Sequence, residues 1–363
     1  MNGFRFAMAA KFDRYDFSAD ALQRASVLTG VPKLLAAFGV PVEAVREGLD
    51  VNPRAFEDPD FRLPFATAGR ILDRCARLTG CGHFGLLLGA AHDHRILGLP
   101  GALMSHSPTL GAALSGFVRL QQMNSQGAAV YLRRFDDAVV IGYGVYDRHA
   151  VGHEQFLPLV MAMALNIVRA LTGGAARVAE LHFSIRPPAD PKPYFAHFGA
   201  PILFNRHETG AVLPRAMLDA PVIDARASEL ERLSRPVAAA QSAAEGARPW
   251  TARVRHAMKP LLLRGEPTTA AMAAHLDLSA RTLTRRLSEE GARFQILLEE
   301  VRFTAARELL LLTDLPIGDI ALALSYAAHA PFVEAFRRWA GIPPSTWRAA
   351  RKGEAREGEA LTP

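Results

Sequence analysis

Residues 278–294, LSARTLTRRLSEEGARF, concentrate basic side chains on one short predicted helix. Because residues four apart lie on one face of a helix, Leu283 and Leu287 are expected to face a core and to leave the rest of the helix exposed. Five arginines lie on this helix or just beyond it: Arg281, Arg285, Arg286, Arg293 and Arg302. Such a helix alone is typical of a solvated surface, so its role depends on the sequence around it.

The basic helix stands second in a pair of short helices. Residues 268–276, TTAAMAAHL, predict a first helix that Thr268 caps, while Ser279 and Gly291 mark the start and the end of the basic helix. Because small residues let two helices cross closely, the tight turn between them projects the second helix outward. This spacing indicates a helix-turn-helix, whose second helix enters the major groove of DNA.

The same pattern returns nearer the C-terminus. Residues 320–336, IALALSYAAHAPFVEAF, predict a helix, a turn at Ser325, and a second helix in which Phe332 and Phe336 face inward. Between the two pairs, residues 294–312 predict an amphipathic helix about 28 Å long at 1.5 Å per residue. Two recognition helices roughly 34 Å apart would reach successive major grooves on one side of the duplex.

The exposed residues of both second helices are the candidates for DNA contact. Arginine pairs bidentately with guanine and threonine contacts the thymine methyl group, whereas contacts to phosphate fix position without reading sequence. The predicted base contacts are Arg281, Thr282, Thr284, Arg285, His329, Ala330, Val333 and Glu334. The predicted phosphate contacts are Thr268, Ser279, Arg286, Arg337, Arg338 and Arg348. A carboxylate at Glu334 either repels phosphate or accepts a hydrogen bond from a cytosine amino group, so we expect less affinity from the second helix.

The composition places the basic surplus in this same region. The 363 residues are half hydrophobic, which allows a sizeable core, and they carry a formal net charge of +6. Residues 251–352 contain 15 lysines and arginines against 10 aspartates and glutamates, a net charge of +5. No run of about 18 or more apolar residues appears. We therefore expect a cytoplasmic, nucleoid-associated protein with no membrane partner.

Upstream of this region, helical patterns give way to strand patterns, which is typical of an α+β domain. Residues 107–123 predict a helix capped by Ser107, and residues 128–147 predict a hairpin that turns at Asp136 and Asp137. Further strands are predicted within residues 178–188 and 200–205. The predicted parts are an α+β effector-sensing and dimerisation domain (1–234), a linker or loose helical connector (235–250), an all-α domain with two helix-turn-helix motifs joined by a long helix (251–352), and a disordered tail (353–363).

Other clusters favour structural roles over catalysis or metal binding. Residues 92–94, HDH, have no third ligand at a suitable spacing, and residues 105–107, SHS, lack a nucleophile elbow. Cys75 and Cys81 match neither a CxxC pair nor a zinc site, so we interpret both as small buried hydrophobic residues. We predict no catalytic residue, no metal site and no cofactor. Four aromatic residues on strands belong either to the core or to an effector pocket: Tyr131, Phe135, Tyr143 and Tyr146.

Residues 251–352 resemble the C-terminal DNA-binding domain of AraC/XylS-type transcription regulators. The segments LSARTLTRRLSEEGARFQILLEEVR and IGDIALALSYAAHAPFVEAFRRWAGIPPSTWR match its two helix-turn-helices and its ending. The segments LGLPGALMSHSPTLGAAL and LHFSIRPPADPKPYFAHFGAPILFN are similar to the effector-sensing domain of the subgroup that contains ornithine-utilisation and virulence regulators. The resemblance implies an activator or repressor that binds double-stranded promoter DNA, often as a homodimer, contacts RNA polymerase and responds to an unknown small-molecule effector.

This sequence departs from the family pattern in the two turns, where glycine is usual and Asp277 and Ser325 stand instead. If either turn needs a left-handed backbone, a residue other than glycine there lowers the stability of the fold by about 1 kcal/mol. Two other hypotheses stay open. One is an alkyltransferase-like enzyme fused to a DNA-binding module, for which His83 beside Cys81 is the only support. The other is a regulator whose N-terminal domain serves only for dimerisation.

Overall fold

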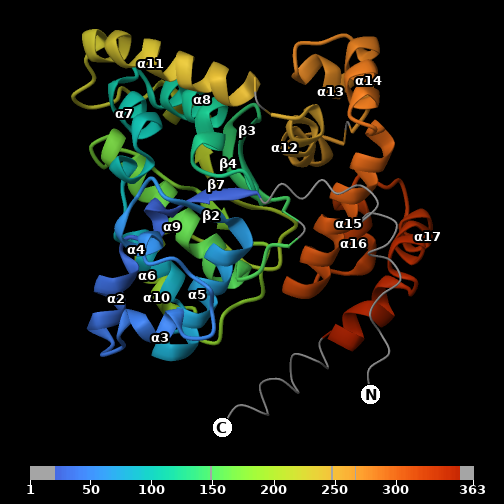
Figure 1. The fold of residues 1–363 in the computed structure, drawn as a ribbon, viewed down its shortest axis with the longest axis horizontal. Coiled ribbons are helices and arrows are strands. Elements are labelled where there is room, and N and C mark those ends of the chain that lie inside the picture. Colours follow the sequence, from blue (N-terminus) through green and yellow to red (C-terminus); the bar gives the residue numbers. More distant parts are fainter. Residues whose placement is uncertain (1–20, 148, 247, 266, 352–363) are drawn as a thin grey trace. The chain divides into compact units, whose positions relative to one another are not determined.

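The structure is a computed structural model that describes residues 21–147, 149–246, 248–265 and 267–351 (Figure 1). The chain divides into two compact units between Arg248 and Pro249. We call residues 21–248 the N-terminal unit and residues 249–351 the C-terminal unit. The tail expected to be disordered, residues 353–363, lies outside the described residues.

A mixed five-stranded sheet forms the frame of the N-terminal unit. Its order is β3 (Ala128–Arg134), β4 (Ala138–Val145), β7 (Thr209–Pro214), β5 (Glu180–His182) and β6 (Ile202–Leu203). Only β5 and β6 run parallel. A separate antiparallel pair joins β1 (Leu22–Arg24) to β2 (Arg62–Pro64). The predicted hairpin is confirmed as β3 and β4, in which Val130 pairs with Tyr143. Strand β7 was not predicted, because TGAVLP lacks a polar alternation.

The core of this unit is the long helix α9 (His153–Leu171), which the sequence analysis did not single out. It is the one helix in the described ranges that is long and apolar enough to cross a membrane, and 72% of its apolar window is buried inside the unit. Helix α6 (Phe84–Ala90) crosses it closely at two glycines. A Cβ atom on Gly85 or Gly89 would lie 2.0 or 2.1 Å from a backbone oxygen of α9. Glycine is therefore required at this crossing.

Further helices complete the N-terminal unit around α9 and the sheet. They are α2 (Val31–Ala37), α3 (Val42–Arg46), α4 (Arg54–Glu57), α5 (Phe65–Thr79), α7 (Leu99–His106), α8 (Leu110–Leu120), α10 (Lys192–Phe198) and α11 (Ala227–Gly246), with the 3-10 turns η1 (Ala25–Leu28), η2 (His94–Leu97), η3 (Gln121–Met123) and η4 (Arg215–Asp219). Helix α11 packs against α7 and takes up most of the stretch expected to be a linker, residues 235–250.

The cap predicted for α8 was wrong. The Ser107 hydroxyl donates to the Leu103 carbonyl at 2.9 Å, at the end of the preceding helix α7. Thr109 caps α8 instead, because its Oγ1 accepts a hydrogen bond from the Ala112 amide at 3.2 Å. An N-cap must directly precede the first helical residue, and that residue is Leu110.

The C-terminal unit is helical throughout its described part, as predicted. Its helices are α12 (Trp250–Leu263), α13 (Thr269–His275), α14 (Ala280–Glu289), α15 (Phe294–Leu312), α16 (Ile317–Ala323) and α17 (His329–Ala340). Two hydrophobic cores share α15, which covers the range predicted for the long helix. Leu297 and Val301 belong to the core of α12, α13 and α14, whereas Ala305 and Leu309 belong to the core of α16 and α17.

Charged groups fasten α12 to this framework. Lys259 pairs with Glu308 of α15 at 3.1 Å, and both side chains are less than a tenth exposed. At the start of α12 the Glu290 carboxylate accepts hydrogen bonds from the backbone amides of Trp250 and Thr251, at 2.6 and 2.9 Å. A carboxylate at a helix N-terminus satisfies open amides and meets the positive end of the helix dipole. The first helix-turn-helix therefore rests on α12 and α15 together.

Candidate nucleic-acid interface

The first helix-turn-helix consists of α13, a turn and α14, and its caps are those predicted. Thr268 Oγ1 accepts from the Ala271 amide and Ser279 Oγ accepts from the Thr282 amide, both at 3.1 Å. Leu283 and Leu287 are fully buried, so their predicted inward orientation is confirmed. In the turn, Asp277 adopts a left-handed backbone with φ of 55°. Most residues with a Cβ atom avoid this conformation, and asparagine and aspartate tolerate it best.

The outer face of α14 presents a donor-rich surface. Arg281, Thr284 and Arg285 are exposed and Thr282 is partly exposed. The Thr284 hydroxyl donates to the Ala280 carbonyl at 2.9 Å, which leaves its methyl group and lone pairs outward. Arg285 pairs with Glu289 on the same helix, and both side chains are more than half exposed. Because an exposed pair of this kind contributes little, Arg285 can exchange Glu289 for a base edge.

Arg286 has different surroundings from its neighbours. Its guanidinium lies over the indole ring of Trp250 at 4.4 Å, and that of Arg253 lies over the same ring at 4.2 Å. Both contacts are cation–π interactions, and the one made by Arg286 joins α14 to α12, whereas Arg253 belongs to α12 itself. The sequence offered no signal for the contact, because Trp250 lies on a different helix. The structure thus places the predicted phosphate contact Arg286 partly inside the C-terminal unit.

The turn of the second helix-turn-helix also carries a left-handed residue, Ser325, with φ of 60°. Here the surrounding side chains support the turn. The Ser325 hydroxyl donates to the Leu262 carbonyl at 2.8 Å. Arg302 of α15 donates to the carbonyls of Leu324 and Ser325, at 2.9 and 3.1 Å, and lies 4.5 Å over the ring of Tyr326. Arg302 is therefore a structural residue of this turn.

Helix α17 has an inner aromatic face and an outer polar face. Phe332 and Phe336 are fully buried, as predicted. His329, Ala330 and Glu334 are exposed near the start of the helix, and Val333 is partly exposed. Arg337 and Arg338 are exposed in its last turn, whereas the half-buried Arg348 donates to the Leu315 carbonyl at 2.8 Å. Of these three predicted phosphate contacts, Arg337 and Arg338 are open to solvent.

The clusters that suggested metal or thiol chemistry have structural surroundings. Among the described residues, no group of three or more His, Cys, Asp or Glu side chains could hold a metal ion. Asp93 caps the turn η2 through the Arg95 amide, and the ring of His92 is hydrogen-bonded to the Val27 carbonyl at 3.2 Å. Burial raises the pKa of the Cys75 thiol to about 12. Reactive cysteines have lowered pKa values, so this thiol is not activated.

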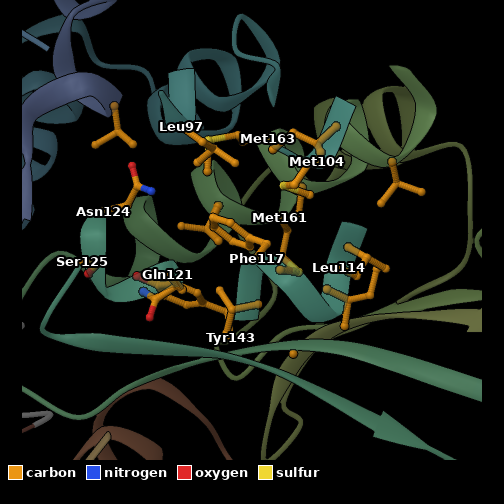
Figure 2. Close-up of a pocket in the computed structure, with 18 of the residues that line it drawn as sticks. Leu97, Met104, Leu114, Phe117, Gln121, Asn124, Ser125, Tyr143, Met161 and Met163 are labelled. Atoms are coloured by element: carbon orange, nitrogen blue, oxygen red, sulfur yellow. The ribbon is translucent and has the colours of Figure 1, made fainter. Parts of the chain in front are cut away.

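A cavity of about 80 Å³ lies inside the N-terminal unit, between α8, α9 and the strands β3 and β4 (Figure 2). Its apolar walls include Met104, Leu114, Phe117, Met161 and Met163. Of the four aromatic residues proposed for the core or a pocket, Tyr143 lines this cavity. Tyr131 instead donates to Glu208 at 3.2 Å, and Phe135 is exposed beneath the guanidinium of Arg133.

Comparisons with known proteins agree with both units. Residues 39–222 match the family described as "Arabinose-binding domain of AraC transcription regulator, N-term", and residues 272–350 match the family "Helix-turn-helix domain". The chain is 27% identical over 328 residues to the ornithine utilization regulator of Pseudomonas aeruginosa. The matched region covers 87% of this chain and 93% of that protein.

Other relatives carry similar names. The chain is 27% identical over 331 residues to the transcriptional regulator VirS of Mycobacterium tuberculosis, covering 91% of this chain and 97% of VirS. The crystal structure of the transcriptional regulator CdpR from Pseudomonas aeruginosa is 23% identical, with a TM-score of 0.44, over 87% of this chain and 96% of CdpR. The ornithine utilization regulator and VirS are both named as regulators and not as enzymes. The chain is a DNA-binding transcriptional regulator with an N-terminal domain of the arabinose-binding type, and it belongs to the AraC family.

Proposed function

We propose that this regulator couples the binding of a small molecule in its N-terminal unit to the recognition of promoter DNA by its C-terminal unit. The observation that carries the proposal is the cavity among α8, α9, β3 and β4. A ligand can shift the equilibrium between two states of a protein only if it binds them unequally. The effector would therefore favour one state of the cytoplasmic protein over another, either one of two conformations or the monomer or homodimer. This shift would change its affinity for DNA or its contact with RNA polymerase.

Base recognition is assigned to the exposed faces of the two second helices. On α14 the reading residues are Arg281, Thr282, Thr284 and Arg285. On α17 they are His329, Ala330, Val333 and Glu334. Arg281 and Arg285 offer bidentate donors to guanine, whereas α17 has a carboxylate and no exposed arginine in this set. The first helix is therefore assigned the larger share of specificity.

Phosphate contacts are assigned to groups that flank these faces. The hydroxyls of Thr268 and Ser279 stand at helix N-termini, where phosphate oxygens are favoured, and Arg337 and Arg338 are exposed at the end of α17. Arg286 and Arg348 are engaged within the protein, so their assigned effect on DNA is indirect: they fix the position of the helices that touch it.

A physical connection runs from the cavity to the end of the N-terminal unit. Met104, which lines the cavity, belongs to α7, and α7 packs against α11. Helix α11 ends at Gly246, close to the boundary of the unit at Arg248. A ligand that displaces Met104 therefore acts on the helix that leads out of the unit. This route is a candidate for the coupling.

The test is DNA selection from a random library with the purified full chain at fixed salt, followed by titration of the best site. We expect two half-elements about one helical turn apart. Arg285→Ala should lose about 1 to 3 kcal/mol on that site and relax the preference at one base pair. Arg338→Ala should weaken all sequences alike and lower the salt slope by about one unit.

The control variant is Arg232→Ala, which removes an exposed arginine of α11 paired only with Glu229. It should leave both the preferred site and the salt slope unchanged. An equal loss for Arg285→Ala on the selected site and on random DNA would show that Arg285 contacts only phosphate. If the affinity for DNA stays the same whichever ligand is bound in the cavity, the N-terminal domain serves only for dimerisation.

A further inference from the structure

We infer that the cavity selects an uncharged molecule with an apolar body and a single polar group that both donates and accepts hydrogen bonds. The inference rests on the proposed function of the cavity as the effector site, and it defines the chemical class of the effector. It differs from a sugar, an amino acid or a carboxylic acid. Three properties of the cavity carry it: the charge of its lining, the open hydrogen-bonding groups on one side, and its size.

The lining of the cavity contains no charged side chain. None of its residues in the described part of the chain is Asp, Glu, Lys, Arg or His. A charged ligand would lose its hydration on entering and would find no opposite charge. The energetic penalty for leaving a buried ion unpaired is far larger than that for a neutral polar group. The cavity therefore excludes carboxylates and ammonium groups.

Four polar side chains in this apolar lining hold atoms without a hydrogen-bond partner in the described protein. These atoms are Gln23 Oε1, Gln121 Oε1, Asn124 Nδ2 and Ser125 Oγ. Each of the four residues is at most 7% exposed. Gln121, Asn124 and Ser125 lie toward one side of the cavity, and Met104 and Leu114 lie toward the other side (Figure 2). Buried polar groups are nearly always hydrogen-bonded, so this cluster marks where a ligand head group binds.

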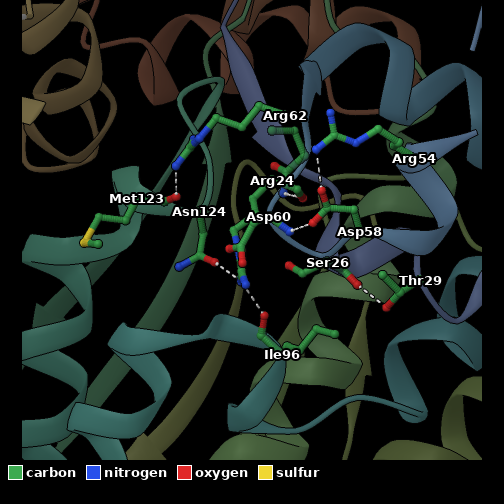
Figure 3. Close-up of polar contacts among 11 residues, drawn as sticks. Arg24, Ser26, Thr29, Arg54, Asp58, Asp60, Arg62, Ile96, Met123 and Asn124 are labelled. Atoms are coloured by element: carbon green, nitrogen blue, oxygen red, sulfur yellow. Dashed lines mark hydrogen bonds and ion pairs between the residues drawn. The ribbon is translucent and has the colours of Figure 1, made fainter. Parts of the chain in front are cut away.

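The contacts of Arg24 fix which atom is open in the amides of Asn124 and Gln23. A guanidinium can only donate, so the Asn124 oxygen faces Arg24 at 3.4 Å and the Asn124 nitrogen stays open (Figure 3). Arg24 is itself held by Asp60 and by the Ile96 carbonyl, both at 2.8 Å. The Gln23 nitrogen donates to the Arg24 carbonyl at 2.9 Å, which leaves the Gln23 oxygen open.

The head group must therefore satisfy both kinds of partner. Two amide oxygens, from Gln23 and Gln121, require a donor, whereas the Asn124 nitrogen requires an acceptor. The Ser125 hydroxyl can serve either role. A primary amide has two hydrogens for the two amide oxygens and an oxygen for Asn124, whereas a hydroxyl donates to one amide oxygen and accepts from the Asn124 nitrogen. A carboxylate has no hydrogen to donate at neutral pH and would face two oxygens that repel it.

Size and wall composition limit the rest of the ligand. The cavity measures about 80 Å³, roughly half the volume of an apolar cavity of about 150 Å³ that holds benzene in another protein, so only a small ligand fits. Three methionines, Met104, Met161 and Met163, line it, and flexible thioether side chains adapt to ligands of different shape. A sugar with four or more hydroxyls would place most of them against these apolar walls. A short alkyl chain with one polar head fits instead, once the flexible methionine side chains move to make room for it.

The experiment measures binding to the purified full chain by calorimetry and by thermal shift, with five probes. They are 1-hexanol, hexanamide, hexanoate, hexylammonium and L-arabinose. We expect saturable binding of 1-hexanol and hexanamide. The other three probes should bind at least about tenfold more weakly, because a buried polar or charged group left without a partner lowers the affinity by about tenfold or more. Hexanoate or L-arabinose binding as tightly as 1-hexanol would overturn the inference. If none of the five probes binds, the inference is also overturned. The open polar atoms of the cavity then have ordered water as their partner and not a ligand.

Variants test whether the head group binds at the polar cluster. Gln121→Leu should weaken 1-hexanol binding by about tenfold or more. It should change the melting temperature of the free protein little, because it removes a buried amide oxygen that has no hydrogen-bond partner in the described protein. Ser115→Ala, which removes a hydroxyl outside the cavity, should leave 1-hexanol binding unchanged. Unchanged binding in both Gln121→Leu and Ser125→Ala would overturn the assignment of the cluster.

The same samples separate this inference from the proposed function. If 1-hexanol binds with the expected selectivity and the affinity for the selected DNA site does not change, the chemistry of the cavity stands and the coupling fails. If a charged probe binds in the cavity and changes DNA affinity, the coupling stands and the inferred ligand class is wrong.

Discussion

Arg285 and Arg286 show how far the roles of two adjacent arginines can diverge. The side chain of Arg285 is 61% exposed and pairs with Glu289, whereas Arg286 stacks over Trp250 at 4.4 Å. The two side chains point to different surfaces, because successive residues on a helix point about 100° apart. Arg285 is available to DNA, and Arg286 contributes to the packing of α14 on α12.

Arg286→Ala should therefore act mainly on folding. We expect the C-terminal unit to lose about 0.5 to 2 kcal/mol of stability, which is the range of cation–π contacts from exposed to desolvated sites. Urea unfolding of the full chain, followed through the fluorescence of its three tryptophans, which all lie in the C-terminal unit, measures this change. Arg285→Ala is the matched control and should leave the unfolding midpoint nearly unchanged. Equal midpoints for the two variants would show that the stack contributes nothing.

The two left-handed turn residues differ in their support. Ser325 gains a hydrogen bond to the Leu262 carbonyl, and Arg302 holds the adjacent carbonyls. Asp277→Gly should stabilise the C-terminal unit by about 1 kcal/mol, since glycine relieves the left-handed strain. Ser325→Gly should gain less, because it also removes a hydrogen bond worth about 1 kcal/mol. Thermal melting of both variants decides the order, and a larger gain for Ser325→Gly would contradict it.

At the scale of elements, the crossing of α6 and α9 depends on two glycines of α6. Gly89→Ala places a Cβ atom 2.1 Å from the Leu159 oxygen, so the helices must separate. We expect a loss of about 1 to 3 kcal/mol, as for other overpacked sites. Gly116→Ala on α8 is the control: its Cβ atom meets nothing within 4 Å, and it should gain about 0.5 to 1 kcal/mol. Circular dichroism melts of the two variants should shift in opposite directions.

Local signals predicted the elements that depend on local chemistry. The caps Thr268 and Ser279, the buried pair Leu283 and Leu287, and the full extent of α15 follow from residue type and helical spacing. The hairpin of β3 and β4 follows from alternation around a turn. These features need no partner distant in the sequence.

Elements defined by distant partners could not be predicted in the same way. Strand β7 is an apolar segment that becomes a strand by pairing with β4 and β5. The cavity joins Gln23 to Gln121 and Met161, which are far apart in the sequence. Its polar side is made of common residue types with no fixed spacing. The sequence indicated a ligand-binding domain only through its resemblance to a family.

At the scale of the whole chain, acid should destabilise the N-terminal unit. Burial lowers the pKa of His92 below its usual value of 6.5, and burial also lowers the pKa of His94, His197 and His207. The unfolded chain then binds protons more readily than the folded one. The stability contributed by these neutral rings is complete above the unfolded pKa of 6.5 and declines as the pH falls toward the lower folded values.

The measurement is the urea midpoint of the full chain between about pH 7.5 and about pH 5.5. We expect the midpoint to fall with pH and to fall less steeply in His92→Gln, whose amide can still donate to the Val27 carbonyl. His149→Gln, which changes a histidine of the same unit in a surface loop, should keep the slope of the parent chain. A midpoint that rises on acidification would contradict the direction of these shifts.

The sharing of α15 between two cores has a consequence for how this protein meets a promoter. Its first half is packed by α12, α13 and α14, and its second half by α16 and α17. Loss of either core removes packing from the helix on which the other depends, so the two halves open as one cooperative segment. We therefore expect no long-lived form of the regulator in which only one of the two helix-turn-helix motifs is folded. If one motif binds a DNA half-site while the other motif stays unbound, we expect the unbound motif to be folded as well.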